Sequence, residues 1–131
     1  EIICKGKDWY ISIAYPQFNS NKLYKTIMLS NHAIATSGTY NNSFKIDEFE
    51  YSHIFDPRLG CPSKNNVISV TVVSSNCIDS DALATSLKVL DYKKGVDLIN
   101  DIEDVECMFI VKEDEVLKNY YSNNFLSFLV K

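Results

Sequence analysis

Alternation of apolar and polar residues along most of the chain predicts a protein built mainly from β-strands. A period of two residues, with β-branched and aromatic side chains at the apolar positions, is typical of strands that bury one face. The segment VISVTVVS at 67–74 is almost entirely apolar or β-branched, which predicts a strand covered on both faces. Strands are expected over residues 9–14, 22–30, 33–40, 44–47, 50–55, 67–74 and 105–112, and in the last segment with Tyr120, Tyr121, Phe125, Phe128 and Leu129.

Turn-forming residues separate these segments. Pro16 and the polar run at 19–21 lie between the first two strands, which predicts a hairpin. The strand from 33 is expected to run into a turn at Ser37-Gly38, and a further turn is expected at 47–49. Residues 56–66 hold two prolines, a glycine and the polar end SKNN, which predicts a loop.

The apolar period changes from two to that of a helix after residue 78. Leu83, Leu87 and Leu90 recur at i, i+4 and i+7, and Asp79 or Ser80 supplies a candidate N-cap. A second short helix fits residues 93–100. Strands before and after a central helical pair predict one α+β domain over residues 1–131, with a mainly antiparallel sheet.

Composition narrows the class of protein. The chain has 131 residues, 46% apolar and 23% charged, with a net charge of −4; its basic residues are scattered, which argues against a nucleic-acid surface. Residues 1–7 lack the apolar segment expected of a signal peptide, and the residues given hold no run of about 18 apolar residues. The four cysteines are too widely spaced for a zinc motif and are expected to be small core residues. The chain begins on Glu1 within a strand-like pattern, so we expect a fragment boundary there.

Two oxygen-bearing residues of the first helix form a candidate metal site. Asp81 and Thr85 are spaced i, i+4, which places both on one helix face. A carboxylate and a hydroxyl are part of the ligand set that Mg²⁺ takes. The alternative is that Asp81 serves the helix dipole in the first turn and Thr85 bonds back to the preceding turn.

The segment SHIFDP supplies a candidate acid or base. His53 is followed closely by Asp56, which could orient it. The alternative is a histidine at a strand end and an Asp-Pro turn. Upstream, Thr36, Ser37 and Gly38 could form an anion-binding turn, to which Arg58 would add positive charge; a plain polar turn is the alternative.

Taken in order, these motifs resemble one family. AIATSGTY, SHIFDPRLG, the β-branched strand and DSDALAT follow one another as in the C-terminal half of the ApbE-type flavin transferases, and WYISIAYP resembles an earlier strand of that family. The resemblance covers roughly residues 9–112. It implies an ApbE-like, T-fold-like fold and the activity of a magnesium-dependent FAD:protein FMN transferase. Such an enzyme moves FMN from FAD to a threonine or serine hydroxyl of a target flavoprotein and releases AMP.

The resemblance also implies roles for individual residues. Asp81 and Thr85 match the metal-binding pair, and His53 matches the histidine that acts as acid/base or flavin-site residue. Asp56 is expected to hold the loop and His53. The residues expected beside the cofactor are Thr36, Ser37, Gly38, His53 and Asp56.

Two departures and one absence limit these expectations. Thr39 stands where the family has Asp or Asn, and Leu59 stands where it has Thr. The family's N-terminal half, which supplies much of the FAD pocket, is expected to be a missing partner of this chain, so the chain alone should be inactive. The resemblance implies a periplasmic or membrane-anchored lipoprotein. The alternatives are a non-catalytic flavin- or nucleotide-binding module, and a purely structural domain that self-associates through exposed edges.

Overall fold

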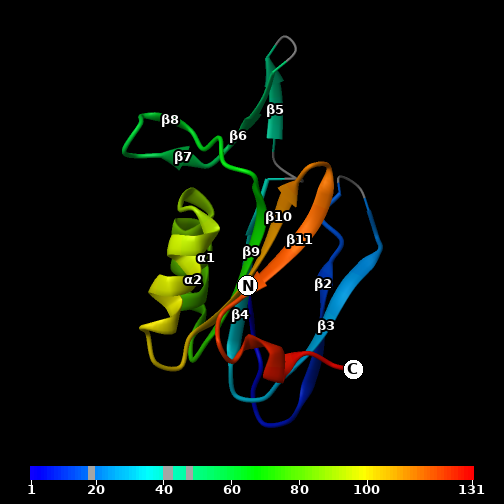
Figure 1. Ribbon diagram of the computed structural model, residues 1–131. Helices are drawn as coiled ribbons and strands as arrows, with labels where there is room; N and C mark the ends of the chain where they lie inside the picture. The colour runs from blue at the N-terminus through cyan, green and yellow to red at the C-terminus, as the bar shows by residue number, and fades with distance from the viewer. Residues whose placement is uncertain (18–19, 40–42, 47–48) are drawn as a thin grey trace.

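The structure is a computed structural model that describes residues 1–17, 20–39, 43–46 and 49–131, with the backbone alone over 43–46 and 49–51. Its centre is a five-stranded sheet in the order β1-β4-β9-β10-β11. All neighbouring strands in this sheet are antiparallel, as Figure 1 shows. The strands are β1 (Ile2–Ile3), β4 (Ala33–Gly38), β9 (Val67–Ser74), β10 (Glu106–Glu113) and β11 (Val116–Tyr121).

Both faces of this sheet are covered. Helices α1 (Cys77–Val89) and α2 (Tyr92–Asn100) pack on one face, and the antiparallel hairpin of β2 (Trp9–Ala14) and β3 (Leu23–Leu29) packs on the other (Figure 1). Two apolar cores result, one on each side of the sheet. The double cover explains why β9 is buried at almost every position, as the sequence predicted.

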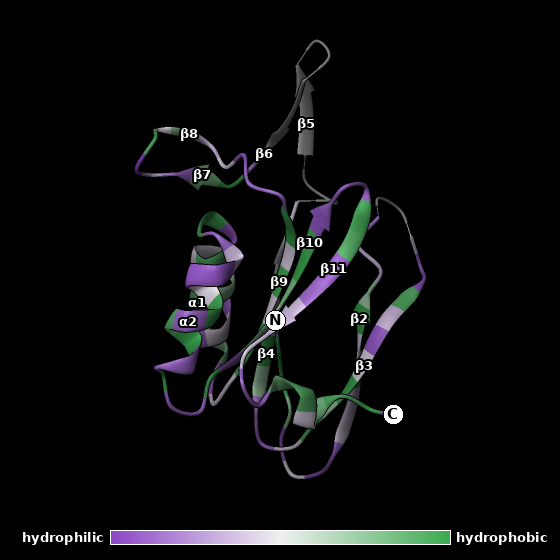
Figure 2. Cartoon of the chain, in the orientation of Figure 1, coloured by the Kyte–Doolittle hydropathy of each residue, from purple (hydrophilic) through white to green (hydrophobic). Residues whose placement is uncertain are grey.

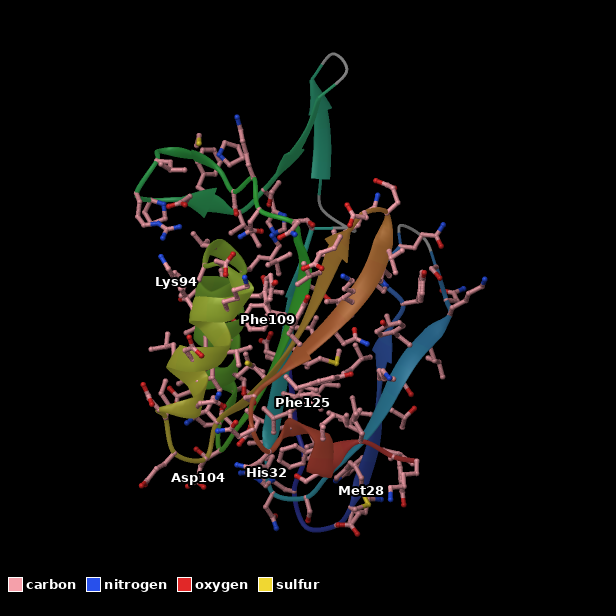
Figure 3. All side chains as sticks on the ribbon, in the orientation of Figure 1. Met28, His32, Lys94, Asp104, Phe109 and Phe125 are labelled. Atoms are coloured by element: carbon pink, nitrogen blue, oxygen red, sulfur yellow. The ribbon has the colours of Figure 1, made fainter. Side chains whose placement is uncertain are left out.

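Side chains alternate between the two cores along the inner strands. Phe109 of β10 lies under the helices, whereas its neighbours Met108 and Ile110 face the hairpin. Figure 3 shows Phe109 between the helices and the sheet, and Phe125 on the hairpin side. Gly95 of α2 lies against the Phe109 ring, so the helix approaches the sheet closely there. Figure 2 shows apolar residues along β9 and around the C-terminal segment.

Two smaller hairpins extend from the upper end of the sheet, one of them above the helices (Figure 1). They are formed by β5 (Ser43–Ile46) with β6 (Phe49–Ser52), and by β7 (Phe55–Asp56) with β8 (Cys61–Pro62). The α+β class, the mainly antiparallel sheet, the helical pair and the first hairpin are confirmed. The turn expected at 47–49 falls largely outside the described residues.

Four local expectations were wrong. The first helix is capped by Asn76, not by Asp79 or Ser80, because the Asn76 side chain accepts the Asp79 amide at 2.9 Å and donates to the Asp79 carboxylate at 2.7 Å. Ser37 and Gly38 lie inside β4 rather than in a turn, paired with Val70 and Ser69. The strand expected at 50–55 and the loop expected at 56–66 are divided differently: β6 ends at Ser52, and the short β7–β8 pair begins at Phe55 and runs into the loop.

The C-terminal segment is the fourth correction, since only its first part is a strand. β11 ends at Tyr121, and Phe125–Phe128 form a 3₁₀ helix, η1. Ser122 ends the ladder: its Oγ accepts the Cys107 amide at 2.8 Å and donates to the Glu106 carboxylate. The chain then turns so that Phe125 fills the core on the hairpin side.

The four cysteines differ in burial. Cys4 and Cys107 are buried, as expected of core residues, whereas Cys61 and Cys77 are half-buried; all four are free thiols. Burial raises the pKa of the Cys107 thiol to about 12.

Neither α1 nor α2, nor any other helix of the described residues, is long and apolar enough to cross a membrane.

Candidate functional site

A cleft of about 600 Å³ lies between β4, the segment that follows β6, and the C-terminal half of α1. It brings together three of the predicted site residues, Ser37, His53 and Thr85, which come from three different elements. Arg58 adds a positive charge, and the rest of the lining is largely apolar. The other lining residues are Ile54, Phe55, Pro57, Ser86, Val89 and Leu90.

Strand alternation decides which residues of β4 face this cleft. Ala35 lies in the core under the helices and Ile34 in the core under the hairpin, so Ser37 shares the helix side and Thr36 the hairpin side. Thr36 is paired with Thr71 of β9, and their hydroxyl oxygens are 2.8 Å apart. The structure therefore places Ser37 at the cleft and directs Thr36 to the opposite face.

The end of β4 is also held by the sheet. Gly38 closes the strand opposite Ser69 and is not among the residues that line the cleft. The next residue, Thr39, donates its amide to the Ile68 carbonyl at 3.1 Å, and its hydroxyl lies 3.5 Å from the same oxygen. The Thr39 hydroxyl is thus directed to the sheet.

Asp81 and Thr85 lie on the exposed side of α1, one turn apart. Asp81 is in the second turn, because Asn76 is the cap and Asp79 the first-turn acid. Ser86 bonds back to the Ala82 carbonyl at 2.8 Å, but Thr85 does not bond back in this way. Within the described residues, neither the Asp81 carboxylate nor the Thr85 hydroxyl has a hydrogen-bond or ion-pair partner.

The chemistry of this pair fits a hard cation. One carboxylate and one hydroxyl on the same helix face are oxygen ligands suited to Mg²⁺, which commonly keeps water or substrate phosphate in its other positions. Thr85 lines the cleft, and Asp81 lies one helical turn N-terminal to it. The described residues hold no cluster of three or more His, Cys, Asp or Glu side chains arranged for a metal, so the pair is a partial ligand set.

Asp56 organises the loop wall of the cleft. Its buried carboxylate receives the Arg58 amide and Nε, both at 2.9 Å, and Nη2 at 2.7 Å. The hydrogen bonds from Arg58 hold the pKa of Asp56 below its usual value. The Asp56 backbone carbonyl accepts the amides of Leu59 and Gly60, which closes the turn. Leu59 itself is exposed, and His53 is exposed at the cleft.

Sequence reasoning missed two polar residues next to this site. Asn65 reaches the C-terminal carbonyls of α1, and Lys88 of α1 is only 1% exposed, with its amine 3.2 Å from the Asn65 amide oxygen. A lysine in a helix and an asparagine in a polar loop are ordinary at exposed positions, so neither residue gave a signal. Their placement depends on how the loop packs on α1.

The fold and the cleft define an α+β domain with an oxygen-bearing site between the end of β4, the loop after β6 and helix α1. The ApbE family model matches residues 1–109, and this chain belongs to the ApbE family. The FAD:protein FMN transferase of Vibrio cholerae is 39% identical over 126 residues, which are 96% of this chain and 37% of the relative. The protein of the same name from Escherichia coli K12 is 33% identical over 126 residues, again 96% of this chain and 36% of the relative.

Solved structures agree with this assignment. The flavin transferase ApbE from Vibrio cholerae superposes with a TM-score of 0.77 at 37% identity, covering 92% of this chain and 38% of that one. The ApbE protein from Thermotoga maritima has a TM-score of 0.80 at 29% identity, covering 95% and 39%. This chain therefore spans less than two fifths of the length of these relatives.

Proposed function

We propose that this chain is the metal-binding and acid/base side of an FAD:protein FMN transferase. The observation that carries the proposal is the cleft itself, in which Ser37, His53 and Thr85 meet from separate elements of an ApbE-family domain. The relatives named for this activity are longer than the chain, so the proposal concerns the full-length protein. The remainder of that protein would complete the flavin pocket.

The reaction is attack by a hydroxyl on a diphosphate. The threonine or serine oxygen of a target flavoprotein bonds to the phosphorus on the FMN side of FAD, the bond from that phosphorus to the AMP oxygen breaks, and AMP leaves. His53, exposed at the cleft, accepts the hydroxyl proton. Ser37, which lines the cleft from the helix side of β4, would donate a hydrogen bond from its hydroxyl group to a phosphate oxygen.

Asp81 and Thr85 would hold Mg²⁺ together with ligands from outside this chain. Bound there, the ion would supply neutralisation of the diphosphate charge. Asp56 and Arg58 neutralise each other, so we assign them to the shape of the loop rather than to proton transfer. Thr36 and Gly38, expected beside the cofactor, do not line the cleft, so we assign the proposed contact with the cofactor to Ser37 of this motif.

The test of this function uses the full-length protein with FAD, Mg²⁺ and a target flavoprotein. We expect covalent FMN on the target, read by mass spectrometry, with one AMP released per FMN transferred. Asp81→Asn should abolish transfer because it removes the only charged ligand of the pair, whereas Asp97→Asn, an exposed acid on α2, should not change it. Full transfer by Asp81→Asn would refute the metal assignment.

One observation favours a second function, a flavin- or nucleotide-binding module without catalysis. Thr39 stands at the family's Asp or Asn position and directs its hydroxyl to the Ile68 carbonyl, so the cleft gains no polar contact from it. Flavin fluorescence titration with and without Mg²⁺ separates the two functions. Binding that ignores Mg²⁺ and releases no AMP would favour the module.

We further expect the full-length protein to be periplasmic or a membrane-anchored lipoprotein, an expectation that rests on the family resemblance alone. Fractionation of cells that express the natural protein tests this expectation directly. Recovery with the cytoplasmic fraction would contradict it.

A further inference from the structure

Two of the three walls of the cleft meet at the C-terminal end of α1. One wall is the segment from His53 to Arg58, and the other is the last two turns of α1. The segment is closed on itself by the Ser63 amide, which donates to the Ile54 carbonyl at 2.8 Å, and by the β7–β8 pair. Because the segment is closed, whatever ties it to α1 sets the position of the whole wall.

Asn65 makes most of that connection. Its side-chain nitrogen lies 2.8, 3.3 and 3.2 Å from the carbonyl oxygens of Lys88, Val89 and Leu90, which share its two hydrogens and which α1 itself leaves unsatisfied. Its side-chain oxygen accepts the Val67 amide at 3.3 Å, which joins the same residue to the start of β9. A single amide group therefore links loop, helix and sheet.

Two cationic side chains complete the connection. The amine of Lys88, which is buried, donates to the Asn65 side-chain oxygen at 3.2 Å. Arg58, held by Asp56, donates through Nη2 to the Val89 carbonyl at 3.3 Å. The loop thus reaches the last turn of α1 at two separate points, and Asn65 is the one whose side chain is wholly engaged.

We propose that Asn65 is a positioning residue, which fixes the distance between His53 on the loop and Thr85 on α1. The proposal rests on the proposed function above. Asn65 does not line the cleft, so it acts through the two walls. Catalysis that depends on in-line geometry is sensitive to such placement, since displacements of about 1 Å can cost about 100-fold in rate.

The experiment compares Asn65→Ala with Asn66→Ala in the full-length protein. Asn66 is the exposed neighbour, and its described contact is made by its backbone carbonyl, which alanine keeps. We expect Asn65→Ala to lower kcat for FMN transfer by ~10-fold or more while the KM for FAD changes by less than ~3-fold. Asn66→Ala should behave as the parent protein.

A second arm separates positioning from general weakening of the fold. His53→Ala removes the group that Asn65 would position, so Asn65→Ala should have little further effect in that background. Equal losses in both backgrounds, or a rise in KM that accounts for the whole loss, would overturn the proposal. Absence of transfer by the parent protein would instead refute the proposed function.

Asn65→Asp covers the case in which the alanine variant does not fold. It keeps the oxygen that accepts from Val67 and Lys88 but cannot donate to the three carbonyls. We expect the same selective loss of kcat, with faster amide exchange over residues 54–62 than in Asn66→Asp. Failure of both Asn65 variants to fold would overturn the positioning role in favour of a structural one.

Discussion

The buried amine of Lys88 allows the effect of a buried charge on the free energy of unfolding to be measured directly. Its side chain is 1% exposed, and no carboxylate among the described residues forms an ion pair with it. Its amine donates to Asn65 and lies in the last turn of α1, where the helix dipole favours a cation. These contacts compensate only in part, because burial lowers the pKa of Lys88 from 10.5 to about 8.

The lowered pKa gives both the size and the pH window of the effect. Each pKa unit is worth about 1.4 kcal/mol, so the lowering corresponds to on the order of 3 kcal/mol of lost stability when the amine is protonated. Between pH 8 and pH 10.5 the unfolded chain holds this proton and the folded chain does not. The Lys88 contribution to the free energy of unfolding therefore rises with pH across that window, and the full cost applies below pH 8.

Lys88→Met removes the amine and keeps a long apolar side chain. At pH 7 we expect the variant to be more stable than the parent by ~1–3 kcal/mol, after the loss of one hydrogen bond to Asn65. The difference should shrink as the pH rises from 8 to 10.5 and vanish only above 10.5, where the parent amine is neutral in both the folded and the unfolded state. Urea unfolding followed by circular dichroism at several pH values measures this difference.

The matched control is Lys94→Met, which changes an exposed lysine that projects from α2 (Figure 3). It should show no pH-dependent difference from the parent over the same range. A Lys88→Met gap that stays constant between pH 7 and pH 10 would refute the reasoning. It would mean that Lys88 titrates normally in the folded protein.

Two further predictions concern the core and the loop. Gly95→Ala should destabilise the protein by ~1–3 kcal/mol, because the added methyl group would overlap the buried Phe109 ring; thermal unfolding by calorimetry measures this loss. Arg58→Met should raise the pKa of Asp56, because the hydrogen bonds that lower it are removed. Since the stability from a lowered carboxyl pKa is lost as the pH falls through that pKa, the variant should begin acid unfolding at a higher pH than the parent. An unchanged carboxyl ¹³C titration of Asp56 would contradict the second prediction.

Much of the fold could be predicted from local pattern. Strands 9–14 and 67–74 were placed with the bounds that the structure has, because period-two alternation and β-branched runs are local properties of the chain. The second helix was also placed within one residue of its start. The N-cap at Asn76 was missed, since Asp79 and Ser80 are equally good caps by residue type.

The candidate site could be predicted only in part, because a sequence motif gives the residue types and their local spacing but not which face of a strand each side chain occupies. Asp81 and Thr85 share a helix face because of the helical period, which the sequence contains. Thr36 and Ser37 were grouped as one turn, whereas their place in a strand sends them to opposite faces. Consecutive strand residues point apart, so one of the two had to leave the cleft.

The sequence by itself determined the elements, the family and the residue types that the chemistry needs, because these depend on local period and on motif order. Only the tertiary structure decided which of those residues meet. It brought Ser37, His53 and Thr85 to one cleft and joined the walls of that cleft through Asn65. It also buried Lys88, whose residue type favours an exposed position. These outcomes depend on contacts between segments far apart in the chain, about which local pattern carries no information.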